Sequence, residues 1–299
     1  MLLAGLRGLI GVVALTWCVY VLVSTGTAWL KADVVLPALL FFAAWLILAL
    51  GMGTAWIASL EALSGQTVNR AAAYRIHALA WLGRYIPGKV ANILPKITAG
   101  PELKQTHQTM LAGSLVEQLG FVATGLLVGL AFIPVLWLRQ LNTYDIARWQ
   151  ILALLVLMLV LIVLAATAIV RNRQVSAVPL GSSAWIKPAA IYIGLHLLLG
   201  IAALPLITTI DSALQAFGAQ EAISAVALSN VSGTLFLIAP AGLGAREAAF
   251  AFLVHMGGNG SLEALAQAAA AMRVISIAAD ACYFLAVRGL QIVNAARTH

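Results

Sequence analysis

Seven charged residues within or beside long apolar stretches are the residues of this sequence that could do chemistry. A charge inside a bilayer costs several kcal/mol unless it is paired or hydrated, so such residues mark ligand sites, ion pathways or internal ion pairs. Cationic side chains of this kind would bind a phosphate, and carboxylates would balance their charge or take up a proton. The seven residues are Arg84, Lys89, Arg246, Arg273, Glu117, Glu247 and Asp280.

Four of these residues lie next to one of two breaks that contain proline and glycine. Arg84 and Lys89 flank Pro87-Gly88, and Arg246 and Glu247 directly follow the segment Pro240–Gly244. Proline removes a backbone donor and glycine relaxes the backbone, so helix ends at these breaks would direct N–H groups at an anion. The predicted substrate-binding set is Arg84, Pro87, Gly88, Lys89, Pro240, Gly242, Gly244, Arg246 and Arg273.

The charged residues also have purely structural interpretations. Arg84 and Lys89 could extend to anionic lipid at the membrane surface, and we expect that position for Lys96 and Lys104. Asp280 lies seven residues from an arginine on the same helix face, so it could simply form an ion pair. We expect ion pairs among the three carboxylates Glu117, Glu247 and Asp280 and the two arginines Arg246 and Arg273.

The elements that carry these residues are predicted to be membrane helices. The 299 residues are 63% hydrophobic and 9% charged, whereas a soluble domain carries about 25% charged residues. A span needs roughly 20 apolar residues. Six stretches meet this requirement: Gly8–Leu30, Leu36–Leu60, Met110–Leu138, Ile151–Val170, Pro188–Ile210 and Leu262–Leu290.

The two regions that contain the breaks, Arg70–Gly100 and Ala222–His255, do not fit a simple span. Unpaired backbone groups at membrane depth are tolerated only inside protein or beside a wet cavity. We therefore interpret both regions as re-entrant hairpins of two half-helices. The alternatives are an interfacial loop for the first region and two full spans for the second.

The order of these segments indicates an inverted repeat. Pro87 and Pro240 are 153 residues apart, and the same offset superposes two pairs of predicted spans. We expect an all-α polytopic protein with one transmembrane domain, 1–299, made of halves 1–149 and 150–299. Each half would cross the membrane three times, so the second half must be inverted, as in many transporters.

The basic residues predict the orientation. Most of the 17 Lys and Arg residues face the cytoplasm if both termini are cytoplasmic. We therefore expect a multi-pass protein of the plasma membrane, the cytoplasmic membrane of a bacterium or archaeon.

The absence of the corresponding motifs argues against several classes of site. The sequence has no GxxxxGK[ST] phosphate loop and no HExxH zinc motif, and its two cysteines lie in predicted spans. We expect no cofactor, no metal and no nucleic-acid partner. His77 is interpreted as a surface or packed histidine.

The two breaks resemble a known family. The segments Arg84–Val90 and Pro240–Glu247 are similar to the R/K-Y-x-P-G and P-G-G-L-G-x-R-E motifs of the lysylphosphatidylglycerol synthase transmembrane, or flippase-like, domain family. Ala241 and Ala91 depart from those motifs, where a glycine and an aromatic residue are usual. The resemblance covers nearly the whole chain and implies movement of a lipid with a polar head, either an aminoacylated phospholipid or a polyprenyl-phosphate-linked sugar.

We therefore expect a lipid flippase-like transporter and not an enzyme. Two cavities, one per leaflet, would receive the lipid phosphate on Arg84, Lys89, Arg246 and Arg273. One alternative is an intramembrane lipid-modifying transferase, in which Glu247 or Asp280 would act as the base. Another is a non-catalytic membrane partner of a glycosyltransferase.

Overall fold

The computed structural model describes residues 32–86, 90–134, 137, 148–171, 183–210, 214–215, 217–236, 240–256 and 261–297. All regular elements within these ranges are helices. Four of them are long and apolar enough to cross a membrane. They are α2 (Ala32–Ser64), α5 (His107–Ala131), α8 (Ile186–Ile210) and α11 (Leu262–Arg297).

These four helices confirm the coarse prediction of an all-helical membrane protein. Each coincides with one of the predicted spans, and α5 ends at Ala131, short of the predicted Leu138. The reason is Pro134, which has no backbone donor and disfavours helical geometry in the residue before it. The predicted span Ile151–Val170 lies within α7 (Arg148–Arg171). The predicted span Gly8–Leu30 lies outside the described residues.

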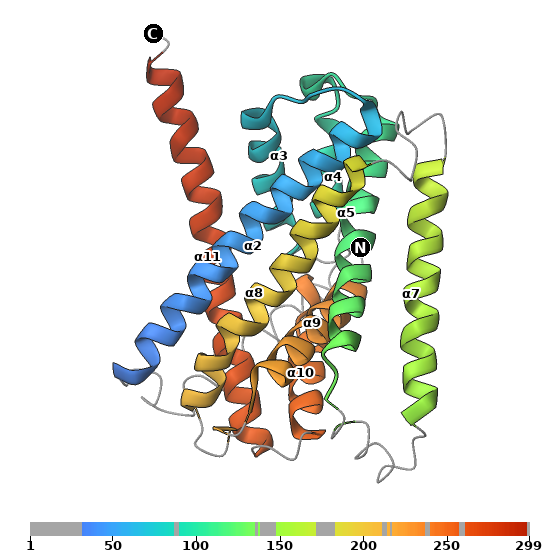
Figure 1. Ribbon diagram of the computed structural model, residues 1–299. Coiled ribbons are helices and arrows are strands. Elements are labelled where there is room, and N and C mark those ends of the chain that lie inside the picture. The colour runs from blue at the N-terminus through green and yellow to red at the C-terminus, as the bar shows by residue number, and fades with distance from the viewer. Residues whose placement is uncertain are drawn as a thin grey trace, which may run out of the picture.

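Four shorter helices lie at the two breaks. These are α3 (Arg70–Gly83), α4 (Val90–Thr98), α9 (Ala219–Leu235) and α10 (Ala245–Met256), and each is shorter than the roughly 20 residues of a span. Figure 1 shows α3 and α4 in the upper half of the molecule and α9 and α10 in the lower half. The pairs fall within the predicted regions Arg70–Gly100 and Ala222–His255, apart from the start of α9 at Ala219 and the end of α10 at Met256. Short 3₁₀ turns lie beside them at η2 (Pro101–Leu103) and η6 (Pro240–Gly242).

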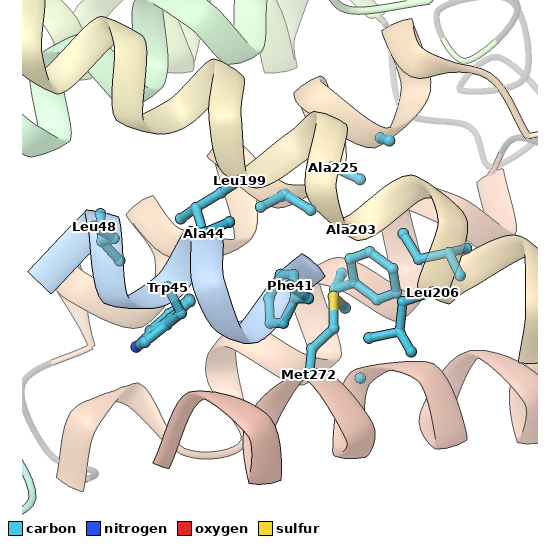
Figure 2. Packing of buried hydrophobic residues seen from close by; sticks show 14 of the residues in the cluster. Phe41, Ala44, Trp45, Leu48, Leu199, Ala203, Leu206, Ala225 and Met272 are labelled. Atoms are coloured by element: carbon cyan, nitrogen blue, oxygen red, sulfur yellow. The ribbon is translucent and has the colours of Figure 1, made fainter. Parts of the chain in front are cut away.

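The long helices pack around a shared apolar core. In Figure 1, α2 and α11 run from the lower to the upper end, whereas α5 and α8 run in the opposite direction. Figure 2 shows Phe41 and Trp45 of α2 near Leu199 and Leu206 of α8, with Met272 reaching toward them from α11. This core holds α2, α8 and α11 together, and it sets the orientation of the α2 face that carries Trp45.

The outer surface is apolar, as lipid contact requires. Leu36 and Leu39 of α2 are 64% and 58% exposed, and Leu161 and Leu164 of α7 are 56% and 58% exposed. The α7 helix packs against α5 at one side of the molecule (Figure 1). A soluble protein would rarely present such an apolar face to water, so these helices are suited to hydrocarbon.

Small residues bring α5 close to the second half of the chain. A Cβ added to Gly129 would lie 2.5 Å from the Leu228 side chain of α9, and the backbone oxygen of Gly129 accepts a hydrogen bond from Ser224 at 2.9 Å. A Cβ added to Gly125 would meet His196 of α8 at 2.8 Å. The two glycines therefore serve helix packing, as the GxxxG spacing predicts.

Candidate functional site

Asp280, on α11, is the centre of a buried polar cluster. Its side chain is fully buried, and its Oδ1 accepts hydrogen bonds from the indole nitrogens of Trp45 and Trp81, at 2.8 and 2.7 Å. Its Oδ2 accepts from the Arg84 guanidinium and the Tyr85 hydroxyl, both at 2.5 Å. Four donors satisfy the carboxylate, so Asp280 ties α2 and the end of α3 to α11.

Aromatic rings surround the guanidinium of Arg84. Its Cζ lies 4.2 Å from the ring centroid of Trp81, 5.4 Å from that of Tyr85 and 5.6 Å from that of Trp45. Ring faces attract a cation, most strongly where water is excluded. The side chain retains 15% exposure, so Arg84 is held in place while part of it still faces open space.

The second break meets the first through the main chain. The backbone N–H of Ala241 donates to the carbonyl oxygen of Arg84 at 2.7 Å. Ala241 and Gly242 both have positive φ, 48° and 70°. A Cβ on Gly242 would run into the backbone of Gly233 on α9, so glycine is required there for both its conformation and its close approach.

Two further arginines share one carboxylate beside this break. The Glu247 Oε1 lies 3.6 Å from Nε of Arg246 and 3.9 Å from Nε of Arg273. The Glu247 Oε2 accepts from the backbone N–H of Gly244 at 2.8 Å, which places the carboxylate at the start of α10. Arg273 is fully buried and donates to the carbonyl oxygen of Ala241 at 3.3 Å.

A cavity opens between the two breaks. Its volume is about 80 Å³, and side chains of α2, α3, α4, α5, α9 and α10 line it. Arg84 and Arg246 form its cationic wall. The other lining residues are Trp45, Leu48, Met52, Trp81, Asn92, Gln118, Phe121, Asn230, Gly233, Thr234 and Ala241.

The charges around this cavity do not cancel. Three arginines, Arg84, Arg246 and Arg273, face the two carboxylates Glu247 and Asp280. The described part of the cluster therefore carries one excess positive charge. The cavity is lined by two of the three cations and by no carboxylate among the described residues, so the excess charge is presented to whatever enters it.

A second ionic cluster lies beside the first. The Lys96 ammonium forms an ion pair with Glu117, and both side chains are at most 2% exposed. The other Glu117 oxygen lies 3.3 Å from Nε2 of His77, whose Nδ1 lies 3.1 Å from the Tyr283 hydroxyl. The His77 ring stacks on Trp81 at 5.5 Å, so the two clusters are in contact.

This second cluster corrects two expectations. Lys96 is not at the lipid surface but 1% exposed, because α4 packs its basic side against α5 and the ring of Trp56. Glu117 is paired with Lys96 instead of with an arginine of the breaks. Lys104, by contrast, is exposed as expected.

The structure separates the predicted substrate-binding residues into three groups. Arg84 and Arg246 line the cavity, whereas Arg273 lies behind it against Ala241. Gly242 and Gly244 shape the second break with positive φ, and Pro240 begins η6. Pro87, Gly88 and Lys89 lie outside the described residues.

Two further features of the cavity were not expected from the sequence. Within the described residues the two breaks meet, and a smaller pocket next to the main cavity shares Trp45, Asn230 and Arg246 with it. Sequence reasoning also missed Trp45 and Trp81, which donate to Asp280. The sequence offered one weak indication of their role: Trp81 lies three residues before Arg84, and Trp45 lies in the predicted span that precedes this segment.

The described residues contain no group of three or more His, Cys, Asp and Glu side chains that could hold a metal ion. The chain matches no known family model, no curated protein and no solved structure.

Proposed function

We propose that this protein moves a lipid with a phosphate-containing head group between the two leaflets of a membrane. The observation that carries this proposal is the cavity between the two helix breaks, whose wall presents Arg84 and Arg246 while the surrounding cluster has an excess positive charge. An arginine fork matches phosphate geometry, and a low-polarity site strengthens that contact. The resemblance to flippase-like domains agrees with this assignment.

The arrangement of the helices supports a transporter. The order long, short, short, long occurs twice, as α2 to α5 and as α8 to α11, and corresponding long helices run in opposite directions in Figure 1. An inverted repeat with paired broken helices provides two related conformations around one site. In this proposal α3–α4 and α9–α10 are re-entrant hairpins, and they enter from opposite leaflets.

In this proposal both termini are cytoplasmic, and the charge distribution supports this for the end from which α11 projects. Arg75 lies on α3, which Figure 1 shows in the upper half of the molecule, where α2 ends and α11 projects. Basic residues outside the bilayer mark the cytoplasmic side. The upper end would therefore face the cytoplasm of the cell that makes the protein.

The geometry favours transport over lipid modification. A transferase needs a free base, but the Asp280 carboxylate already accepts from four donors. Glu247 is held between two arginines and a backbone N–H. All the hydrogen bonds that Asp280 accepts are therefore taken up by protein groups, whereas Glu247 Oε1 has ion-pair contacts but no hydrogen-bond partner among the described residues. Arg84 and Arg246 both line the cavity.

Reconstitution into liposomes tests the proposal. The probes are phosphatidylglycerol with a fluorescent acyl chain and a fluorescent isoprenyl phosphoglucose, and the measurement is the rate at which each head group becomes accessible from outside. We expect the protein to accelerate at least one probe over empty liposomes, without changing its chemical structure. No acceleration for either probe would reject the proposal, and a chemically altered lipid would favour a transferase.

Two matched variants connect the rate to the cavity. Arg246→Gln removes a cavity cation and should slow the rate by roughly 10- to 100-fold, since a hydrogen bond to a charged group contributes about 1.5–3 kcal/mol. Arg75→Gln removes a half-exposed cation that pairs with Glu102 outside the cavity. It should leave the rate unchanged, and equal effects of the two substitutions would contradict the assigned site.

A further inference from the structure

A buried histidine connects the second ionic cluster to the cavity wall. His77, on α3, is fully buried, and its ring stacks on Trp81 with 5.5 Å between the ring centroids. Its Nε2 lies 3.3 Å from a carboxylate oxygen of Glu117, and its Nδ1 lies 3.1 Å from the hydroxyl oxygen of Tyr283. Both ring nitrogens therefore have a partner, one on α5 and one on α11.

These two partners can hold the imidazole of His77 in either protonation state. In the neutral tautomer that satisfies both, Nε2–H donates to Glu117 and Nδ1 accepts a hydrogen bond from the Tyr283 hydroxyl. A proton from water that binds Nδ1 reverses only the second bond, because the new N–H donates to the Tyr283 oxygen and the hydroxyl hydrogen turns away. The change breaks no covalent bond and leaves both contacts in place.

The fully buried His196, on α8, lacks this arrangement. Its ring stacks on Phe121 at 4.3 Å, and its Nε2 lies 3.0 Å from the backbone oxygen of Phe121. Its Nδ1 has no hydrogen-bond partner among the described residues. A second proton on this ring would have no acceptor within the described part of the chain, so His196 is a matched control for His77.

The buried carboxylates are less suited than His77 to take up a proton. Glu117 and Asp280 each form an ion pair with a basic side chain, and Glu247 lies between two arginines. A cation beside a carboxylate favours the ionised form of that carboxylate. The imidazole, which changes charge near neutral pH, is therefore the better acceptor in this region.

The His77 cluster lies one helical turn from the cavity. Its titratable residues on α3, α4 and α5 each lie four positions from a cavity-lining residue of the same helix. Residues four apart on one helix have Cβ atoms about 5–6 Å apart. A proton on the cluster and an anion in the cavity would therefore lie within range of mutual attraction. The three pairs are His77 and Trp81, Lys96 and Asn92, and Glu117 and Phe121.

The charges around His77 make its protonation depend on an anion. Lys96 and Arg84 repel a proton on the ring, whereas Glu117 attracts it. A phosphate on the cavity arginines would offset the repulsion. One unit charge at about 10 Å shifts a proton equilibrium by about one pH unit where the effective dielectric constant is about 20. The other groups near His77 are Tyr283 from α11, Trp56 from α2 and Tyr74 from its own helix.

We propose that His77 binds a proton when a lipid phosphate binds in the cavity, so that movement of the lipid is coupled to a proton. This inference rests on the proposed function. A lipid with a single negative charge would then cross together with one proton, and no net charge would move. A pH difference across the membrane would drive the lipid, whereas a membrane potential would not.

Proton uptake on lipid binding provides the first test. Purified protein in detergent and weak buffer is titrated with dihexanoyl phosphatidylglycerol between about pH 5 and pH 8, and a pH-sensitive dye reports the uptake. Dihexanoylglycerol, which has no phosphate, is the blank. At the pH of maximum uptake we expect about half a proton or more per bound lipid, which a shift of about one pH unit produces. No uptake by the parent protein with the lipid bound would overturn the inference.

Three variants locate the proton. His77→Gln replaces the ring with a carboxamide that cannot bind a proton at these pH values, so it should remove the uptake. Tyr283→Phe keeps the imidazole but removes the acceptor for the new N–H, so it should reduce the uptake. His196→Gln should leave the uptake as in the parent. Isothermal titration of the same lipid measures binding by each variant, which separates loss of uptake from loss of folding.

The distribution of lipid between leaflets provides the second test. Trace fluorescent phosphatidylglycerol is measured in both leaflets of liposomes after a pH difference of one unit is imposed, with empty liposomes as the blank. Coupling of one proton to one lipid should enrich the probe up to about tenfold on the alkaline side, since one pH unit is a tenfold difference in proton activity. A potassium diffusion potential should leave the distribution even. His77→Gln should abolish the enrichment, and His196→Gln should retain it.

The outcomes separate the two proposals. Rapid exchange of the probe between leaflets, with an even distribution under the pH difference, would overturn the proton coupling and leave the proposed function intact. Uptake or enrichment that persists in His77→Gln would also overturn the inference, because the proton would then bind elsewhere. Absence of lipid binding and of any exchange would instead reject the proposed function, together with the coupling that rests on it.

Discussion

The Lys96–Glu117 ion pair gives a stability prediction that does not depend on function. Glu117→Gln leaves the ammonium of Lys96, 2% exposed, without its carboxylate. Breaking a buried pair from one side costs about 3–5 kcal/mol of unfolding free energy, because the remaining charge is desolvated and unpaired. The double variant Lys96→Met/Glu117→Leu removes both charges and should recover most of that loss, to within about 2 kcal/mol of the parent.

A double-mutant cycle in mixed micelles measures this coupling. The unfolding free energy is obtained by titration with sodium dodecyl sulfate for the parent, Lys96→Met, Glu117→Gln, Glu117→Leu and the double variant. Arg75→Gln breaks a half-exposed pair with Glu102 and should cost about 1 kcal/mol or less. The reasoning is refuted if the double variant is as unstable as the sum of its single substitutions, or if Glu117→Gln costs no more than Arg75→Gln.

Three further predictions concern the second break, Asp280 and the α5–α9 contact. Ala241 has a φ of 48°, so Ala241→Gly should raise the unfolding free energy by up to about 1 kcal/mol. Gly242→Ala should lower the unfolding free energy by more than that, because the added Cβ would meet the backbone of Gly233. Titration of both variants with detergent tests whether the two changes in unfolding free energy have opposite signs. Asp280→Asn keeps an acceptor for the indole nitrogens but removes the charge beside Arg84, and it should slow lipid translocation about tenfold or more in liposomes, whereas an unchanged rate would show that the pair is only structural. Gly129→Leu should separate α5 from α9 and lower the thermal unfolding temperature in detergent, and an unchanged temperature would contradict the close contact.

The long helices and the two breaks are predictable from the sequence because they depend on local properties. An apolar run of sufficient length specifies α2, α8 and α11 without reference to the rest of the chain. Proline and glycine likewise mark the gap between α9 and α10. The end of α5 was placed too late because its apolar composition continues past the point where Pro134 stops the helix.

The pairing of the buried charges is not predictable in the same way. Lys96 and Glu117 lie on different helices, and only the packing of α4 on α5 brings them together. Hydropathy placed Lys96 at the surface because it is near a helix end in a basic segment. The donors of Trp45 and Trp81 were missed for a related reason, since tryptophan in an apolar helix is usually part of a core or an interface.

The hydrogen bond from Ala241 to the carbonyl oxygen of Arg84 makes the contact between the two breaks sensitive to hydration. In a dry, apolar setting such a bond is worth about 4–6 kcal/mol, but only about 0.5–1.5 kcal/mol once water can replace either partner. Because both partners are main-chain groups, most side-chain substitutions leave this dependence unchanged. Water that follows a polar head group into the cavity would therefore weaken the contact, and its departure would restore it, so that separation of the two breaks is coupled to the wetting of the site.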